Sequence, residues 1–348
     1  MRTIRQLLLS VLLLVSGTGY AQLSQNLFEE FLLSGTEDAN TLFGHYMLPG
    51  MKGLGYGVNS GWYNTAKPHE TFGFDITLSY VNAIVPEADK TFEFLDSEYN
   101  FTFLGSGSSS TLPTLMGDSP DIPSVLDLSL DGNTVVSSYN APDGVSADID
   151  KITMIGGSVP TPIIQVGFGL VKGTELKIRW LPDINIGEGE FKFKYFGLGG
   201  MHSISQWLPV FKNIPVDISA FVGWTTISAE YAIPENFNVP GVNQRATADI
   251  TTFTYQLIAS AHVSVLTGYV ALGYDNFKTN FKMLGTYDIS NPAVQLVLED
   301  PIDLDQEGNS GFRTAFGARL KLSIITLTAD YTLREYNTLT LSLGFSVR

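Results

Sequence analysis

Apolar and polar residues alternate strictly over the last ten residues of the chain. From Leu339 to Arg348, one set of positions holds leucine, phenylalanine and valine, and the other holds threonine, serine, glycine and arginine. A period of two places the two sets on opposite faces of an extended strand. Comparable alternation recurs upstream and predicts strands over residues 72–80, 175–180, 190–195, 253–263, 312–321 and 325–334.

So many alternating strands, with aromatic residues near their ends, favour a membrane β-barrel over a soluble sandwich. In such a barrel the apolar face meets lipid, the polar face lines the lumen, and aromatic residues mark both interfaces. The sheet has to close, because each unpaired backbone group in hydrocarbon costs several kcal/mol. We therefore expect an all-β fold, a transmembrane antiparallel β-barrel of about 14 strands, or alternatively about 12, preceded by a short N-terminal helical segment.

The start of the chain has the features of a secretory signal peptide. Arg2 and Arg5 precede the apolar stretch Leu7–Val15, and Gly19-Tyr20-Ala21 supplies small residues for cleavage. We expect residues 1–21 to be this signal peptide, which directs the chain to the bacterial envelope.

The mature chain divides into two expected parts. Residues 22–50 show helical spacing of apolar residues up to Pro49-Gly50, and we expect them to form a plug of the lumen or a periplasmic segment. Residues 51–348 form the expected outer-membrane β-barrel, in which Gly53–Gly57 opens the first strand.

Three segments interrupt the strand pattern and are expected to be long loops: Gly105–Asp148, Ile233–Ala246 and Asp288–Ser310. The first is rich in glycine, serine and proline, which is typical of an extracellular loop. Tight joins such as Glu335–Asn337 predict short periplasmic turns.

Composition limits the classes of partner and chemistry. The 348 residues include no cysteine and carry a net charge of -15, and removal of residues 1–21 leaves 18 basic against 35 acidic residues, net -17. An acidic chain without basic clusters is a poor match for nucleic acid, which needs lysine and arginine patches to neutralise phosphate. The lack of cysteine removes disulfides and thiolate chemistry.

Charged residues on the predicted polar strand faces are the candidate lumen lining. One interpretation is a charged lumen that selects or positions a solute, and the other is a set of opposite charges that pair across the lumen and fill it. The candidate residues are Asp75, Glu175, Lys177, Arg179, Glu190, Lys192, Lys194, His262, Arg313, Arg319, Lys321, Asp330 and Arg334.

No catalytic or cofactor-binding pattern accompanies these charges. The four histidines are far apart and lack the spacing of metal ligands. His262 lies beside Ser260 and Ser264, but the sequence supplies neither an orienting acid nor an oxyanion hole. We therefore expect no enzyme and no cofactor.

Acidic residues gather in two of the predicted loops, over residues 118–150 and 299–307. The sequence from Asp303 to Glu307 resembles part of a calcium loop, but the twelfth position is Thr314 rather than glutamate, so an EF-hand is rejected. Loose binding of divalent cations and a merely solvated acidic surface both remain open.

Two stretches resemble a known family. VNSGWYNTAKPH at residues 58–69 and HSISQWLP at residues 202–209 resemble an uncharacterised outer-membrane β-barrel family, a domain of unknown function from Bacteroidota-type bacteria. This resemblance implies a barrel fold and an outer-membrane location over most of the mature chain. More loosely, the expected architecture is similar to that of the long-chain fatty-acid transport barrels.

The expected function is passive transport, with the barrel as a channel or transporter for small or hydrophobic solutes and the N-terminal segment as a partial plug. The alternative is a non-transporting surface or structural barrel whose long acidic loops bind an external partner. Both place the protein in the bacterial outer membrane, in contact with its lipid and lipopolysaccharide, after insertion by the barrel-assembly machinery. The transport hypothesis adds a small-molecule solute, and neither includes nucleic acid.

Overall fold

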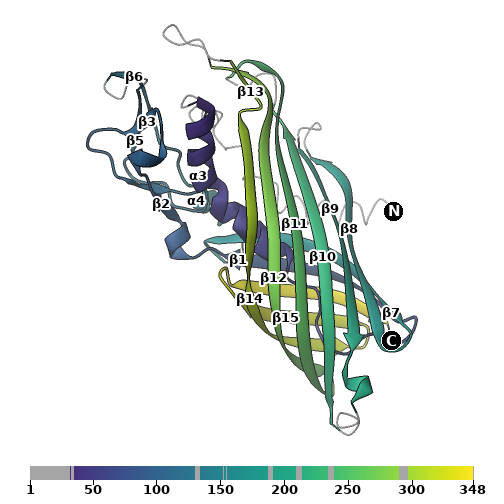
Figure 1. Ribbon diagram of the computed structural model, residues 1–348. Helices are drawn as coiled ribbons and strands as arrows, with labels where there is room; N and C mark the ends of the chain where they lie inside the picture. The colour runs from purple at the N-terminus through teal and green to yellow at the C-terminus, as the bar shows by residue number, and fades with distance from the viewer. Residues whose placement is uncertain are drawn as a thin grey trace.

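Ten strands close into an antiparallel ring within the part of the chain that the computed structural model describes, namely residues 32, 35–129, 134–151, 153, 155–186, 191–208, 214–233, 239–289 and 297–347 (Figure 1). Consecutive strands of the ring pair with each other, and β1 closes it by pairing with β7 and β16. The strands are β1 (Phe74–Ile84), β7 (Ser158–Leu170), β8 (Thr174–Ile186), β9 (Phe191–Ser203), β10 (Val216–Ala232), β11 (Gly241–Val263), β12 (Leu266–Asp288), β14 (Ile302–Leu322), β15 (Ile325–Leu333) and β16 (Thr338–Val347).

The expected antiparallel barrel is confirmed, but the expected number of strands, about 14 or about 12, is wrong. Strands β11, β12 and β14 have 23, 23 and 21 residues, so they occupy chain that shorter strands would have divided. The described residues between 85 and 157 add no strand to the ring. Two of the expected loops are partly strand, because β11 begins at Gly241 and β14 at Ile302.

Residues 85–157 form a small folded unit, the cap, at one end of the ring (Figure 1). The long loop expected over Gly105–Asp148 therefore contains regular structure. Its short strands form a two-stranded and a three-stranded sheet. The cap elements are η2 (Glu87–Asp89), β2 (Thr91–Glu93), η3 (Asp96–Glu98), β3 (Thr102–Leu104), β4 (Thr111–Pro113), β5 (Val125–Ser129), β6 (Val135–Asn140) and α4 (Ser146–Ile149). Outside the cap, η4 (Ser205–Trp207) joins β9 to β10, and β13 (Val297–Glu299) pairs with β12.

The two ends of the ring differ in their connections. The end that holds the C terminus has the short joins at residues 171–173, 264–265 and 323–324 and one longer join, residues 204–215 with η4, and we call it the short-turn end. The opposite end, the loop end, carries the cap and the join at residues 289–301. The turn Glu335–Asn337 was expected among the short turns and lies instead at the loop end, because β15 and β16 meet there.

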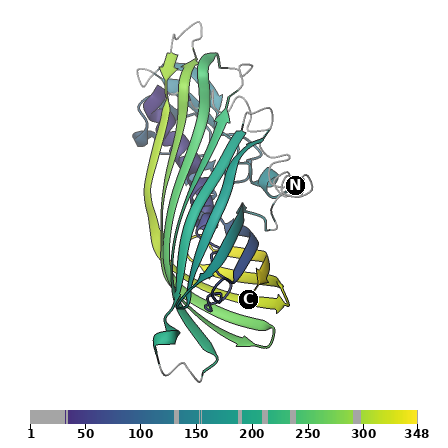
Figure 2. The same cartoon turned by 90° about the vertical axis from the view of Figure 1, so that its right-hand side faces the viewer.

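Helix α3 (Gly35–Val58) enters the ring from the loop end (Figure 2). It does not end at Pro49-Gly50, and residues 53–57 belong to it rather than to a strand. A Cβ on Gly53 would lie 2.4 Å from Val159 Cγ2, so glycine lets the helix lie directly against β7. Glycine lowers helix propensity by about 1 kcal/mol relative to alanine, and the close packing outweighs this cost. No helix among the described residues is long and apolar enough to cross a membrane.

The two faces of the long strands exchange character part-way along their length. On β12 the outward residues near the short-turn end are apolar, as at Val270, whereas Lys278 follows on the same face nearer the loop end. The inner face changes in the opposite sense, from Asp275 to the buried Phe281 and Met283. Because side chains alternate strictly along a strand, both faces change at one level, which we call the inversion level.

The apolar outer band has the chemistry and height of a membrane-spanning belt. Its border on three strands is a series of aromatic rings, in which the Tyr274 centroid lies 5.7 Å from that of Tyr255 and 5.3 Å from that of Phe312. From Leu266 to Tyr274, β12 has the roughly 9–11 residues that a tilted strand needs to cross hydrocarbon. The rest of this strand therefore lies beyond the belt.

Beyond the inversion level, the inner face of the long strands packs against α3 and the cap. Phe43 and Tyr46 of α3 are buried in one apolar cluster with Phe281 and Met283 of β12 and Leu126 of the cap. The ring centroids of Phe43 and Phe281 lie 4.9 Å apart. This end of the molecule is thus built like a water-soluble domain, with an apolar interior and a polar exterior.

The inversion level predicts where a charge on the outer face is tolerated. Val270→Lys places a charge near the middle of the belt and should lower the free energy of unfolding by about 2–4 kcal/mol. Asn276→Lys, on the same face just past Tyr274, should change it by less than about 0.5 kcal/mol. Urea unfolding of the protein from lipid vesicles measures both, and equal losses would contradict the position of the belt.

Candidate functional site in the lumen

Residues 59–73, which we call the lumen segment, connect α3 to β1 and run through the ring to the short-turn end. Much of the segment is buried, including Trp62, Tyr63 and Ala66. The Ala66 backbone N–H donates to Ser260 Oγ at 3.0 Å, and Ser219 Oγ donates to the Ala66 carbonyl. The segment is therefore fastened to β10 and β11 within the lumen.

Trp62 fills a space that glycine leaves open on the ring wall. A Cβ on Gly199 of β9 or on Gly223 of β10 would lie 2.8 Å from the indole ring. The Arg179 guanidinium stacks on the Trp62 indole, with its Cζ 3.5 Å from the indole centroid. Trp62 is thus held between the wall and a buried cation.

Three arginines, two on ring strands and Arg334 directly after β15, bind carbonyls at the end of α3 and the start of the lumen segment, and we call them the arginine collar. Arg179 donates to the carbonyls of Val58 and Ser60 at 2.5 and 2.6 Å. Arg313 donates to the Asn59 carbonyl at 2.9 Å, and Arg334 to the Tyr56 carbonyl at 2.6 Å. The last carbonyls of a helix lack intrahelical partners and carry partial negative charge, so cationic donors stabilise them.

Asp275 joins two members of the collar. Its carboxylate accepts from Arg334 Nη1 at 2.5 Å and from Arg313 Nη1 at 3.4 Å, and it is almost fully buried. Asp330 lies at a neighbouring position and accepts from the Tyr269 hydroxyl at 3.1 Å. These contacts compensate buried charge within the lumen and leave the collar fixed in place.

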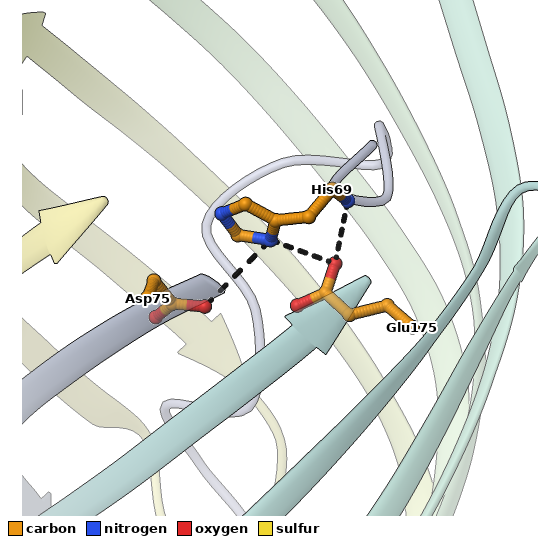
Figure 3. Close-up of side chains that lie close together, drawn as sticks. All are labelled: His69, Asp75 and Glu175. Carbon is orange, nitrogen blue, oxygen red and sulfur yellow. Dashed lines mark hydrogen bonds and ion pairs between the residues drawn. The ribbon is translucent and has the colours of Figure 1, made fainter. Parts of the chain in front are cut away.

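A second cluster lies at the short-turn end, where His69 of the lumen segment approaches Asp75 of β1 and Glu175 of β8 (Figure 3). His69 Nδ1 lies 3.2 Å from Glu175 Oε2 and 3.7 Å from Asp75 Oδ1. The His69 backbone N–H also donates to Glu175 Oε2 at 3.1 Å, and Lys177 donates to the other Glu175 oxygen. This cluster is where the lumen segment leaves the ring.

The structure places most of the sequence-predicted lumen residues inside the ring. Arg319 is buried near the second cluster, and Lys321 approaches Ser346 at 3.5 Å. His262 is largely exposed at the short-turn rim, where its Nδ1 lies 3.9 Å from Asp217 Oδ2. Those inside are Asp75, Glu175, Lys177, Arg179, Arg313, Arg319, Asp330 and Arg334.

The prediction was wrong for Lys192 and Lys194. Both are exposed and share the outer face of β9 with Phe196, and Lys192 pairs with Glu230 at 2.8 Å. Tyr195, which lies between Lys194 and Phe196 in the sequence, is buried and therefore points to the inside of the ring. The prediction assumed that the apolar face meets lipid along the whole strand, whereas these lysines lie beyond the inversion level. Glu190 lies outside the described residues.

Sequence reasoning missed His69, Trp62, Tyr63, Asp275 and Tyr269. The first three belong to a segment without alternation, so its passage through the lumen had no periodic signal. Asp275 does interrupt an apolar stretch of β12 as a lone acid, and that signal could have placed it inside the ring.

Comparison with protein families identifies the group to which this protein belongs. Residues 1–347 match the family described as "Family of unknown function (DUF6588)". The chain belongs to this family. The DUF6588 match supports the expected resemblance to an unknown-function family, while the Bacteroidota-type origin stays a prediction. A search of curated proteins found no match.

Solved structures similar to this DUF6588 protein include barrels of diverse roles. Ail, the attachment invasion locus protein of Yersinia pestis, in complex with the heparin analogue sucrose octasulfate, is 9% identical at a TM-score of 0.27, covering 80% of this chain and 99% of that chain. The translocator domain of the autotransporter NalP from Neisseria meningitidis is 9% identical at a TM-score of 0.29, and the match covers 90% of this chain and 99% of that chain. The Ralstonia pickettii toluene transporter TbuX is 8% identical at a TM-score of 0.25, and the match covers 86% of this chain and 97% of that chain.

Outside the belt, α3 of the DUF6588 protein is fixed to the turn between β15 and β16. Lys52 Nζ and the Tyr56 hydroxyl donate to the Glu335 carboxylate at 2.8 and 2.6 Å. Burial acts to raise the pKa of the Glu335 carboxyl, but the two hydrogen bonds and the Lys52 charge outweigh it and lower this pKa below its ordinary value. The ionised carboxylate therefore contributes to holding the helix.

This contact predicts an acid-dependent loss of stability. Because the Glu335 pKa is lower in the folded chain, its contribution is complete above the ordinary pKa of about 4.5 and is lost as the pH falls through the folded value. Glu335→Gln should lower stability by up to about 1 kcal/mol at pH 7 and by less at pH 3.

Thermal unfolding in detergent at both pH values measures this difference. Glu87→Gln is the matched control, because it removes a carboxylate that is also paired with a lysine, Lys90, but is exposed on the cap and away from α3. If the Glu335→Gln difference persists unchanged at the lower pH, the ionic contribution is refuted.

Proposed function

We propose that this protein is a closed outer-membrane barrel that carries a folded cap on the cell surface and seals its own lumen. The observation that carries the proposal is the lumen segment, which is buried inside the ring and held there by the arginine collar. Neutral helix carbonyls and cationic guanidinium groups satisfy each other, so the seal is part of the folded state.

The location and orientation rest on the belt and on the two ends. The apolar belt suits hydrocarbon, and bacterial barrels place short turns in the periplasm and longer connections outside. This orientation puts the short-turn end with the C terminus in the periplasm and the cap outside. On this proposal the chain is a structural protein and no enzyme.

The sealed lumen argues against an always-open channel for hydrophilic solutes. Trp62 and Tyr63 occupy the interior beside Phe221, with ring centroids 5.3 and 5.9 Å from the Phe221 centroid. The expected transport function would therefore require displacement of the lumen segment. This gated function is the second candidate, and the polar character of the contacts between the collar and α3 favours it, because water can replace such contacts more readily than an apolar core.

The external partner of the alternative hypothesis would bind the cap. Its exposed residues include Glu93, Asp118 and Asp121. A basic protein surface, or lipopolysaccharide bridged through divalent cations, matches this acidic character. Both remain proposals about the surface and neither involves the lumen.

Single-channel conductance of the refolded mature protein in planar bilayers tests the seal. The unaltered protein should show no steps. The double variant Arg179→Ala and Arg313→Ala should show intermittent steps, because it removes donors to three carbonyls where α3 meets the lumen segment and leaves Asp275 less compensated.

Arg245→Ala is the matched control, since Arg245 lies at the loop end of β11, away from the collar. It should be as silent as the unaltered protein. Steps from the unaltered protein would overturn the closed barrel and support transport, and silence from the double variant would show that the collar is not what keeps the lumen closed.

A further inference from the structure

We propose that His69, Asp75 and Glu175 bind a divalent transition-metal ion of the zinc type at the short-turn end of the lumen. His69 Nδ1 lies beside one carboxylate oxygen of each partner, Asp75 Oδ1 and Glu175 Oε2, and each of the three residues offers a ligand atom within 4.8 Å of those of the other two. Zinc bonds of about 2.0–2.2 Å place two ligands of a tetrahedral ion roughly 3.4 Å apart. The separations of 3.2 and 3.7 Å from Nδ1 agree with this geometry.

The remaining polar atoms of the three residues already have partners. Asp75 Oδ2 accepts from Thr77 Oγ1 at 2.6 Å, and Glu175 Oε1 accepts from Lys177. His69 Nε2 lies 3.1 Å from Ser346 Oγ. A metal-binding histidine typically uses its second ring nitrogen in just such a hydrogen bond, which orients the ring.

Two of the three converging atoms lack a hydrogen bond although they are buried. His69 Nδ1 and Asp75 Oδ1 have no partner of acceptable geometry, and Asp75 is 3% exposed. When the Nε2 hydrogen donates to Ser346, Nδ1 presents a lone pair to two carboxylate oxygens. Such an arrangement is unfavourable unless a cation lies among the three atoms.

A glycine makes the approach of the two carboxylates possible. Asp75 on β1 and Glu175 on β8 are separated by β7, which contributes Gly167 at this level. A Cβ on Gly167 would lie 2.2 Å from Asp75 Oδ1 and 2.7 Å from Glu175 Oε1. The absence of a side chain at Gly167 therefore leaves the space that both carboxylates occupy.

Nearby cations compete with a metal ion for the two carboxylates and so reduce its affinity. Lys177 donates to Oε1 of Glu175, and both Lys177 and Arg319 interact electrostatically with the two carboxylates. The imidazole nitrogen favours a transition metal over Ca²⁺ or Mg²⁺, which prefer all-oxygen sites. The competing occupant is a proton on Nδ1.

A bound ion would connect three parts of the chain that lie far apart in sequence. His69 belongs to the lumen segment, whereas Asp75 and Glu175 belong to the ring. The ion would thereby fasten the lumen segment where it leaves the ring, independently of the arginine collar at the other end.

Equilibrium dialysis of the folded, chelator-treated protein against Zn²⁺ tests the proposal, with metal measured by mass spectrometry. The full mature chain in detergent should bind one Zn²⁺ that excess Ca²⁺ does not displace, and its melting temperature should rise with Zn²⁺. His69→Ala and Asp75→Asn should each raise the Kd for Zn²⁺ at least 10-fold, which corresponds to about 1.4 kcal/mol of binding free energy. Gly167→Ala, which keeps every ligand, should raise this Kd too.

Two further variants test whether Zn²⁺ binds at this cluster rather than elsewhere on the rim, and whether Lys177 competes with it. His262→Ala removes the other histidine that lies beside a carboxylate at this rim and should leave Zn²⁺ binding unchanged. Lys177→Met removes a competing cation and should tighten Zn²⁺ binding. Circular dichroism confirms that each variant is folded before it is scored.

Absence of stoichiometric Zn²⁺ in the unaltered protein would overturn the proposal. So would equal binding by folded His69→Ala and Asp75→Asn variants. Channel conductance is measured separately, so a failed metal site and a failed seal are distinguishable.

Discussion

The strict alternation of side chains along a strand is the constraint on which the rest of this structure depends. A strand that is continuous from hydrocarbon into water needs an apolar outer face first and a polar outer face afterwards. The inner face must change in the opposite sense. Asp275 and Phe281 therefore share the inner face of β12, the polar residue before the inversion level and the apolar residue after it. The long strands thus create an apolar inner surface that has to be covered.

Helix α3 and the cap provide that cover, and their position determines what happens in the lumen. Packing of Phe43 and Tyr46 against the long strands directs the helix into the ring, so its carbonyl end comes to lie among buried groups. Unpaired carbonyls there would cost free energy, and the arginine collar supplies their donors. Arg179, Arg313 and Arg334, for which the sequence left both solute selection and mutual pairing open, therefore hold the helix end.

The sequence predicted the faces of the strands well where one environment acts along their length. It predicted the interior position of Arg179 and Arg313 but misplaced Lys192 and Lys194, because a change of environment reverses the meaning of the pattern. The site at His69 could not be predicted from spacing. Its carboxylates are brought together by closure of the ring and by a glycine on the intervening strand, and neither is a local property.

The seal has two layers of different physical character. The outer layer, around Phe43, is an apolar core whose disruption exposes buried surface to water. The inner layer consists of charge-assisted hydrogen bonds to the end of α3 and of the contacts of residues 59–73, which water can replace at lower net cost. Any opening of the lumen that preserves the cap must therefore act on the inner layer. The residues that decide between a permanent seal and a gate are those of the arginine collar and the lumen segment, and not the first half of the helix.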